Sequence, residues 1–150
     1  MSFRGILIAN RGEIAIRIAR AAQDLGLRTV AVYSDDDALS LHTQIADEKI
    51  RLEGAGAAAY LNMEGVIAAA KQADCDAIHP GYGFLSEQDA FAQLCTNAGI
   101  KFIGPSAEHL SLFGDKARAR AAAIAAGVPV MPGLDRSVTL AEAQAFYKEH

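Results

Sequence analysis

Residues 5–26, GILIANRGEIAIRIARAAQDLG, decide the fold of this 150-residue chain. The first part, GILIAN, is a short continuous apolar run, which indicates a strand buried on both faces of a sheet. The second part, GEIAIRIARAAQDLG, is typical of an amphipathic helix that ends at Gly26. Its inward face carries Ile14, Ile18, Ala21, Ala22 and Leu25. A buried strand that leads directly into such a helix is the first step of an alternating α/β fold.

The same alternation continues through the chain as far as Gly114. Further strands are predicted at residues 28–34, 49–52, 75–80 and 101–104. Further helices are predicted to start at the cap Asn62, to run from Ser86 to Asn97, and to start at the cap Ser106. The glycine- and alanine-rich segment 54–60, GAGAAAY, is predicted to be a loop. Short loops between alternating strands and helices predict a doubly wound, mostly parallel α/β sheet.

The character of the sequence changes after Gly114. Residues 115–127 predict an alanine-rich helix, and a proline-bearing extended segment follows. Thr139 and Glu142 stand at capping-box positions for one more helix, which has no stop signal before His150. We therefore expect a sheet domain over 1–114, a helix and linker over 115–134, and the start of another unit over 135–150. We also interpret the chain as a fragment of a longer protein.

Composition narrows the class of protein. Hydrophobic residues make up 51% and charged residues 21%, which is globular, and the net charge of −4 argues against binding to nucleic acid or anionic membranes. No apolar run approaches the roughly 20 residues that span a bilayer, and no signal peptide is recognisable. Cys75 and Cys95 lack metal-ligand spacing, and we interpret them as buried thiols, with a disulfide between them as the alternative. We therefore expect a cytoplasmic protein without a metal site of its own.

Polar residues follow the first two strands at the edge where open α/β sheets bind ligands. The segment NRGEIA, residues 10–15, precedes the first helix, whose N-terminal N–H groups could face an anion. It holds one glycine, so the dinucleotide-binding fingerprint is absent, and Asp35 supports only an alternative reading as the ribose-binding acid of a nicotinamide enzyme. Arg11 and Glu13 equally fit a structural role in closing the strand–helix corner.

The segment HPGYGF, residues 79–84, stands at the end of another predicted strand. Gly81 and Gly83 permit positive φ and close approach of a ligand to the backbone. Tyr82, between two glycines, is expected to project its ring and hydroxyl. This segment is either a proline–glycine turn with an exposed tyrosine or the wall of a binding site, and His79 could simply brace the turn.

Three basic residues on predicted helices can each be interpreted either as solvated surface residues or as contact residues. Arg17 and Arg20 lie on one side of the first helix, as a solvated face or as a subunit contact. Lys116 follows Phe113-Gly114-Asp115 at a helix start, where it is either solvated or reaches a phosphate as a point charge.

Together these motifs resemble the biotin carboxylase family, the first component of acetyl-CoA, propionyl-CoA, pyruvate and urea carboxylases. Their order and spacing carry the resemblance from Ile6 to about Gly133. The matching segments are IANRGEIAIRIARAA (8–22), YLN (60–62), AIHPGYGFLSE (77–87), FIGPS (102–106) and GDK (114–116).

The resemblance implies a Rossmann-like domain followed by the start of an ATP-grasp module. The family uses MgATP and bicarbonate to form carboxyphosphate, and it then carboxylates N1 of biotin on a carrier protein. The resemblance implies that Lys116 contacts ATP and that Tyr82 and Gly83 border the biotin and bicarbonate pocket. It also implies that Arg17 and Arg20 take part in dimer contacts.

The resemblance also implies partners and limits. The parent enzyme is expected to be a homodimer that works with a biotin carboxyl carrier domain and a carboxyltransferase, separate or fused. The family's glycine-rich lid, magnesium-binding glutamates and bicarbonate-binding basic residues would lie beyond His150, so the 150-residue chain alone is expected to be inactive. The alternative is a non-catalytic nucleotide-binding or assembly module. The carboxyltransferase would choose the final acyl-CoA or keto acid.

Overall fold

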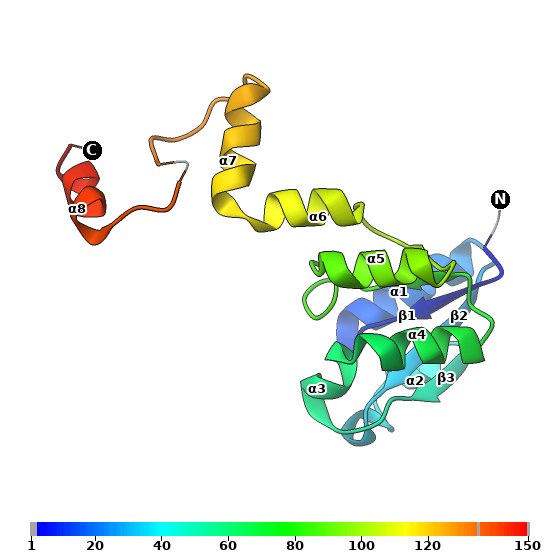
Figure 1. Ribbon diagram of the computed structural model, residues 1–150. Helices are drawn as coiled ribbons and strands as arrows, with labels where there is room; N and C mark the ends of the chain where they lie inside the picture. The colour runs from blue at the N-terminus through cyan, green and yellow to red at the C-terminus, as the bar shows by residue number, and fades with distance from the viewer. Residues whose placement is uncertain (1–2, 135, 150) are drawn as a thin grey trace. The chain divides into compact units, whose positions relative to one another are not determined.

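The computed structural model describes residues 3–134 and 136–149. The chain divides into two compact units, one up to Ala107 and one from Glu108 onward (Figure 1). The division into domains expected around residue 114 stays a prediction.

The first unit contains a five-stranded, wholly parallel sheet within its described residues, in the order β3-β2-β1-β4-β5. The strands are β1 Gly5–Ile8, β2 Arg28–Tyr33, β3 Glu48–Arg51, β4 Ala77–His79 and β5 Lys101–Phe102. Ile8 is in register with Ala31 of β2 on one side and with His79 of β4 on the other. Since every residue of β1 is buried, the continuous apolar run of the sequence occupies the sheet centre, as predicted.

Helices cover both faces of this sheet. They are α1 Gly12–Asp24, α2 His42–Ile45, α3 Gly56–Leu61, α4 Met63–Gln72 and α5 Asp89–Asn97, with a 3₁₀ turn at Asp35–Asp37. Helix α1 packs against α2, and α4 packs against α5. Because parallel crossovers are right-handed, a chain that moves from β1 outward to β3 and then returns to β4 places these two pairs on opposite faces. This is the predicted doubly wound architecture.

The core of the first unit lies between the sheet and these two helix layers. Its largest fully buried side chains include Tyr60, Phe91, Leu7, Ile8, Ile78 and Leu85. On one side, Phe91 of α5 meets Phe102 of β5 edge-to-face at 5.9 Å between ring centres. Strand β3 is largely exposed because its sequence, EKIR, suits an edge position.

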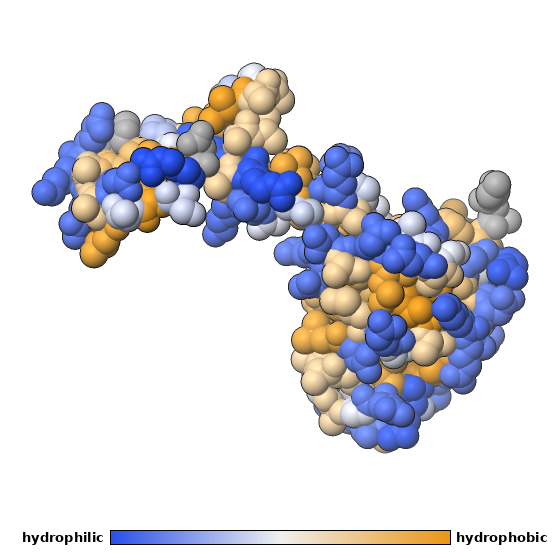
Figure 2. All heavy atoms as spheres, viewed as in Figure 1, coloured by the Kyte–Doolittle hydropathy of each residue, from blue (hydrophilic) through white to orange (hydrophobic). Residues whose placement is uncertain are grey.

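The second unit consists of helices, which are α6 Ala107–Gly114, α7 Lys116–Ala125 and α8 Leu140–Glu149. None of its described residues is buried, and Figure 2 shows hydrophobic residues on its surface. Met131, Leu140 and Tyr147 are each more than three-quarters exposed. The capping box of α8 is confirmed, since Glu142 Oε2 accepts from Thr139 N at 2.8 Å and Thr139 Oγ1 accepts from Glu142 N at 3.3 Å. The described residues of this unit therefore show secondary structure without a core of their own.

Several local predictions differ from the structure. Ala21 and Leu25, predicted on the inward face of the first helix, are exposed, because α1 packs on the sheet through Ala15, Ile18, Ala19 and Ala22. The loop predicted over residues 54–60 is wrong, because Gly56–Leu61 form α3, whose first N–H donates to Asp36 and whose Tyr60 is buried in the core. The helix predicted from Ser86 starts only at Asp89, because Ser86 N donates to Gly83 O and closes a turn. The short helix α2 was not predicted. By contrast, the Asn62 cap of α4 is confirmed, with Gly65 N donating to Asn62 Oδ1 at 3.0 Å.

Candidate functional site

The order of the sheet reverses between β1 and β4, and this point positions the candidate site. Chains leaving the carboxyl ends of these two strands turn to opposite faces, which opens a crevice in doubly wound folds. The segment after β1 contains Asn10, Arg11 and Gly12, and the segment after β4 contains residues 80–86. The two motifs singled out in the sequence, NRGEIA and HPGYGF, therefore meet at the switch point of the sheet.

Asn10 joins the two segments. Its side chain is buried, and its Nδ2 donates to Pro80 O at 2.7 Å and to Tyr82 O at 2.8 Å. Its Oδ1 accepts from Arg11 N at 2.9 Å, so both ends of the amide are used. A Cβ at Gly81, where φ is +67°, would lie 2.8 Å from Asn10 Nδ2. The positive φ and the close contact together explain why a glycine stands at 81.

His79 braces the same turn. Its Nδ1 accepts from Gly81 N at 3.1 Å, and its carbonyl accepts from Ala9 N at 2.9 Å. Burial lowers the pKa of His79 below its usual value of 6.5, which favours the neutral ring that accepts this bond. The role that the sequence left open for His79 is thus at least structural.

Tyr82 and Gly83 form the exposed part of the loop, and the half-buried Phe84 follows them. The Tyr82 side chain projects outward, as predicted, and the residue is 65% exposed. Gly83 has φ +65°, and a Cβ there would meet nothing within 4 Å, so its backbone faces open space. Phe84 has φ +42°, an unusual conformation that costs about 1–2 kcal/mol for a residue with a side chain. Its ring stacks on Tyr60 at 5.3 Å between centres.

An ion pair between Arg11 and Asp37 supports this loop from behind. Arg11 Nη1 lies 2.9 Å from Asp37 Oδ2, and the same oxygen accepts from the Tyr60 hydroxyl at 2.9 Å. Ser40 Oγ donates to Asp37 Oδ1 at 2.9 Å. Burial raises the pKa of Asp37, but the hydrogen bonds from Arg11, Ser40 and Tyr60 outweigh it and hold the pKa at about 2. Asp37 is therefore ionised at neutral pH and accepts hydrogen bonds from all three of these side chains.

The neighbouring acidic residues are engaged elsewhere. Asp35 pairs with Arg51 of β3, and Asp36 accepts from Gly56 N at the start of α3. The Asp35 carboxylate is therefore already held in an ion pair, which argues against the alternative role of Asp35 as a ribose-binding acid. Asp37 was not singled out from the sequence. It lies in the turn that follows β2, a strand that neighbours β1 in the parallel sheet, and this position is the signal that could have identified it.

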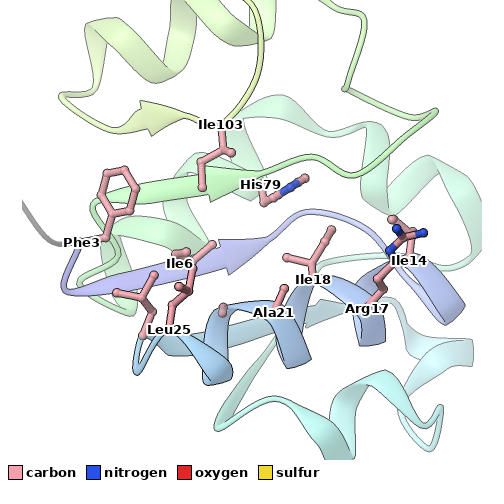
Figure 3. A pocket seen from close by; sticks show the side chains of 11 residues that line it. Phe3, Ile6, Ile14, Arg17, Ile18, Ala21, Leu25, His79 and Ile103 are labelled. Carbon is pink, nitrogen blue, oxygen red and sulfur yellow. The ribbon is translucent and has the colours of Figure 1, made fainter.

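Arg17 and Arg20 are both exposed on α1. Arg17 also lines an apolar groove beside this helix (Figure 3). The groove has a volume of about 400 Å³. It lies between α1 and the β1–β4–β5 side of the sheet, with Arg17 and His79 as its polar members. Its apolar lining includes Phe3, Ile6, Ile14, Ile18, Leu25 and Ile103. The face that carries the predicted subunit contact therefore exposes apolar surface as well as charge.

Lys116 belongs to the second unit, while Tyr82, Gly83, Arg17 and Arg20 belong to the first. It is exposed and is the first residue of α7. Asp115 Oδ1 caps this helix by accepting from Ala117 N and Arg118 N at 2.9 and 3.0 Å. Because the cap occupies these backbone donors, a phosphate at this helix start would be met by side-chain cations, of which Lys116 is the first.

The possible metal ligands and the two cysteines of the described residues bear on the predictions made from the sequence. Within residues 3–134 and 136–149, no cluster of three or more His, Cys, Asp or Glu residues could hold a metal ion. Cys75 and Cys95 are buried free thiols, as expected, and burial raises the pKa of each to about 11. No helix within these residues is both long enough and apolar enough to cross a membrane.

The fold, with the loop of residues 80–86 at the switch point of the sheet (the switch-point loop), defines the class as a Rossmann-like α/β domain. Residues 2–110 match the family model described as the N-terminal domain of biotin carboxylase. The chain belongs to this family.

Relatives and solved structures agree with this assignment. The chain is 58% identical over 132 residues to pyruvate carboxylase of Staphylococcus aureus, covering 87% of this chain and 12% of that protein. It is 53% identical over 134 residues to biotin carboxylase of Halalkalibacterium halodurans, covering 89% of this chain and 30% of that protein. The chain thus spans less than a third of the curated relatives it matches here.

Two solved structures extend the comparison to three dimensions. The biotin carboxylase domain of a single-chain bacterial carboxylase superimposes with a TM-score of 0.92 at 53% identity, over 96% of this chain and 34% of that one. The biotin carboxylase domain dimer of 2-oxoglutarate carboxylase from Hydrogenobacter thermophilus has a TM-score of 0.91 at 42% identity, over 99% of this chain and 33% of that one. The latter was solved in complex with MgADP, ADP and bicarbonate.

Proposed function

We propose that this chain is the amino-terminal part of an ATP-dependent biotin carboxylase, a ligase that uses MgATP and bicarbonate to carboxylate carrier-bound biotin. The family match over residues 2–110 is the observation that carries this proposal. The complex of the 2-oxoglutarate carboxylase domain with MgADP and bicarbonate supports the same substrates here.

In this proposal the switch-point loop forms one wall of the biotin and bicarbonate pocket. The bare backbone of Gly83 leaves room for a ligand to approach closely. The exposed Tyr82 offers a flat apolar ring and a hydroxyl that can donate a hydrogen bond. Both properties suit a ligand that combines a ring with polar ureido groups.

Lys116 is proposed to contact the polyphosphate of ATP. An ammonium group at a helix start, next to a capped first turn, supplies positive charge where phosphate charge shifts during transfer. The described residues offer no cluster for magnesium, so the metal ligands would be contributed by another part of the carboxylase. We therefore expect the 150-residue chain alone to lack carboxylase activity.

The proposed partners are a biotin carboxyl carrier domain, a carboxyltransferase and a second copy of the same enzyme. Arg17 and Arg20 are the proposed dimer contacts, and the apolar groove beside them supports a contact on this face. The proposed location is the cytoplasm, which suits two free cysteines. The alternative function is a non-catalytic nucleotide-binding or assembly module, which would show no bicarbonate-dependent ATP cleavage even within the complete parent protein.

Replacing Lys116 by alanine in the complete carboxylase tests the proposed function. The loss of a charge-assisted phosphate contact is expected to raise the KM for ATP by about 10-fold or more, because such a bond contributes about 1.5–3 kcal/mol. Steady-state kinetics of bicarbonate-dependent ATP cleavage would measure it.

Lys148→Ala is the matched control, since Lys148 is an exposed lysine on α8 of the same unit. It should leave the KM for ATP unchanged. An unaltered KM in the Lys116→Ala enzyme would refute the assignment of Lys116, and a parent protein without any such activity would refute the proposed function itself.

A further inference from the structure

The loop that carries Tyr82 and Gly83 is held in an unusual backbone conformation. Gly81, Gly83 and Phe84 all have positive φ. Among the described residues, Phe84 and Asp74 are the only non-glycine residues with this property. Such conformations persist only where the surroundings hold them, and they concentrate at functional sites. The contacts that hold Phe84 therefore decide where Tyr82 and Gly83 lie.

Arg11 faces the ring of Phe84. Its Cζ lies 5.9 Å from the centre of that ring and 5.6 Å from the centre of the Tyr60 ring. The two rings stack on each other with an angle of 13° between their planes. A guanidinium group near both ring centres attracts each of them through its positive charge. Arg11 thereby ties the end of the loop to helix α3, which carries Tyr60.

Asp37 fixes the direction of the Arg11 side chain. The carboxylate pairs with Arg11 Nη1 at 2.9 Å and receives the Tyr60 hydroxyl at 2.9 Å, so it holds the cation and one of its two rings together. The Asp37 side chain is 15% exposed and that of Arg11 is 37% exposed, so solvent screens this pair only in part. An arginine held at its guanidinium end keeps a single orientation toward Phe84.

Asn10 holds the other end of the loop through Pro80 O and Tyr82 O. The loop is thus anchored on both sides of Gly81 by Asn10 and at Phe84 by Arg11, two consecutive residues after β1. Gly83 lies between these anchors, and the Tyr82 side chain projects from the second of the two carbonyls that Asn10 holds.

We propose that Arg11, oriented by Asp37, is a positioning residue that holds Phe84 and so sets the place of Tyr82 and Gly83 for substrate. This inference rests on the proposed function, because it takes the loop as a wall of the biotin and bicarbonate pocket. Arg11 acts here through the loop and does not itself touch the reacting atoms. Loss of the Arg11 side chain should raise the KM for the substrates that bind at this wall and leave the KM for ATP unchanged.

The test is Arg11→Met in the complete carboxylase, with biotinylated carrier domain, bicarbonate and ATP varied in turn. We expect the KM for the carrier and for bicarbonate to rise about 10-fold, a 1.4 kcal/mol effect, with the KM for ATP within about twofold of wild type. Asp37→Asn should raise the same two constants to a smaller extent. Arg11→Lys, which keeps the charge, should restore part of the loss.

Arg28→Met is the matched control. Arg28 is also a half-buried arginine in an ion pair, 2.9 Å from Glu48, but it lies at the amino end of β2, away from the loop. It should lower stability without changing any KM. If Arg11→Met leaves all three KM values unchanged, or raises them no more than Arg28→Met does, the positioning role is wrong.

Two further outcomes have separate meanings. If Arg11→Met does not fold, the milder variants Arg11→Lys and Asp37→Asn decide, and wild-type KM values in both would overturn the proposal. If the wild-type carboxylase cleaves no ATP in response to bicarbonate, the proposed function fails before Arg11 is tested. The two failures are therefore distinguishable.

Discussion

At the scale of single residues, Gly81 and Gly83 show how one loop uses glycine for two different reasons. Both have positive φ, but a Cβ at Gly81 would meet Asn10 Nδ2 at 2.8 Å, whereas a Cβ at Gly83 meets nothing within 4 Å. Gly81 is thus required by the fold of the loop. Gly83 leaves an open surface, which is the arrangement that a ligand needs.

Alanine at each position separates these two requirements. Gly83→Ala should cost about 1 kcal/mol of the free energy of unfolding, because it adds only the backbone strain of positive φ. Gly81→Ala should cost about 2 kcal/mol or more, because it adds a contact with the buried Asn10 amide. Urea unfolding of the 150-residue chain would measure both. Equal losses would show that Asn10 yields freely and does not clamp the loop.

The same residues show how far sequence reasoning reaches at this scale. The glycines around Tyr82 predict an exposed ring, and the structure confirms it. Asp37 was not singled out, because a run of three aspartates does not tell which carboxylate turns inward. Only the packing of Tyr60 and Arg11 against that turn selects Asp37.

At the scale of elements, α1 has two functional sides. Its inner face packs on the sheet through Ala15, Ile18, Ala19 and Ala22. Its outer side carries Arg20, and Arg17 lies at the apolar groove. Exposed apolar surface flanked by charge is typical of a protein contact.

Arg17→Glu combined with Arg20→Glu in the complete carboxylase tests the proposed dimer contact. Reversing two charges beside the apolar groove is expected to weaken self-association, because charge mismatch at an interface costs several kcal/mol. Sedimentation velocity should show a shift from dimer toward monomer. Lys71→Glu on α4, at the opposite face of the sheet, is the control and should leave the dimer intact. A dimer that survives the double substitution would remove Arg17 and Arg20 from the interface.

Element boundaries show why local pattern fails where it does. The alanines of residues 57–59 are good helix formers, yet the surrounding glycines indicated a loop. Helix α3 forms because Asp36 accepts from its first N–H and because Tyr60 enters the core. Helix α5 starts at Asp89, three residues after the predicted start at Ser86. Phe84 has positive φ and Ser86 closes a turn with Gly83, so these residues are not helical. A contact distant in sequence thus decided the start of α3, and a preceding turn decided the start of α5.

At the scale of the whole molecule, two histidines make the stability of the first unit sensitive to pH. Burial lowers the pKa of both His42 and His79 below 6.5. His42 donates from Nε2 to Val32 O at 3.2 Å, and its Nδ1 has no partner among the described residues. Among the described residues, the ring of His42 bonds to the Val32 carbonyl and that of His79 to the Gly81 N–H, so the folded state favours the neutral form of each.

The free energy of unfolding should therefore fall as the pH drops below 6.5. A folded-state pKa below the unfolded value means that the unfolded chain binds more protons in that window, so stability is fully present above 6.5 and is lost toward the folded pKa. Urea unfolding of the chain at pH 8 and pH 5.5 would show the loss. His79→Gln should reduce the slope. Equal stability at the two pH values would contradict it.

Taken by itself, the sequence determined the fold class, the parallel sheet and the two motifs at its edge. It could do so because the spacing of apolar residues and the positions of glycines determine the backbone conformation of the segment in which they stand. The tertiary structure alone decided that Asn10 clamps the HPGYGF loop, that Asp37 orients Arg11, and that Phe84 is held by Tyr60. These contacts join residues up to 72 positions apart in the chain. The physical reason is that the strand order, which no local pattern encodes, brings the ends of β1, β2 and β4 together.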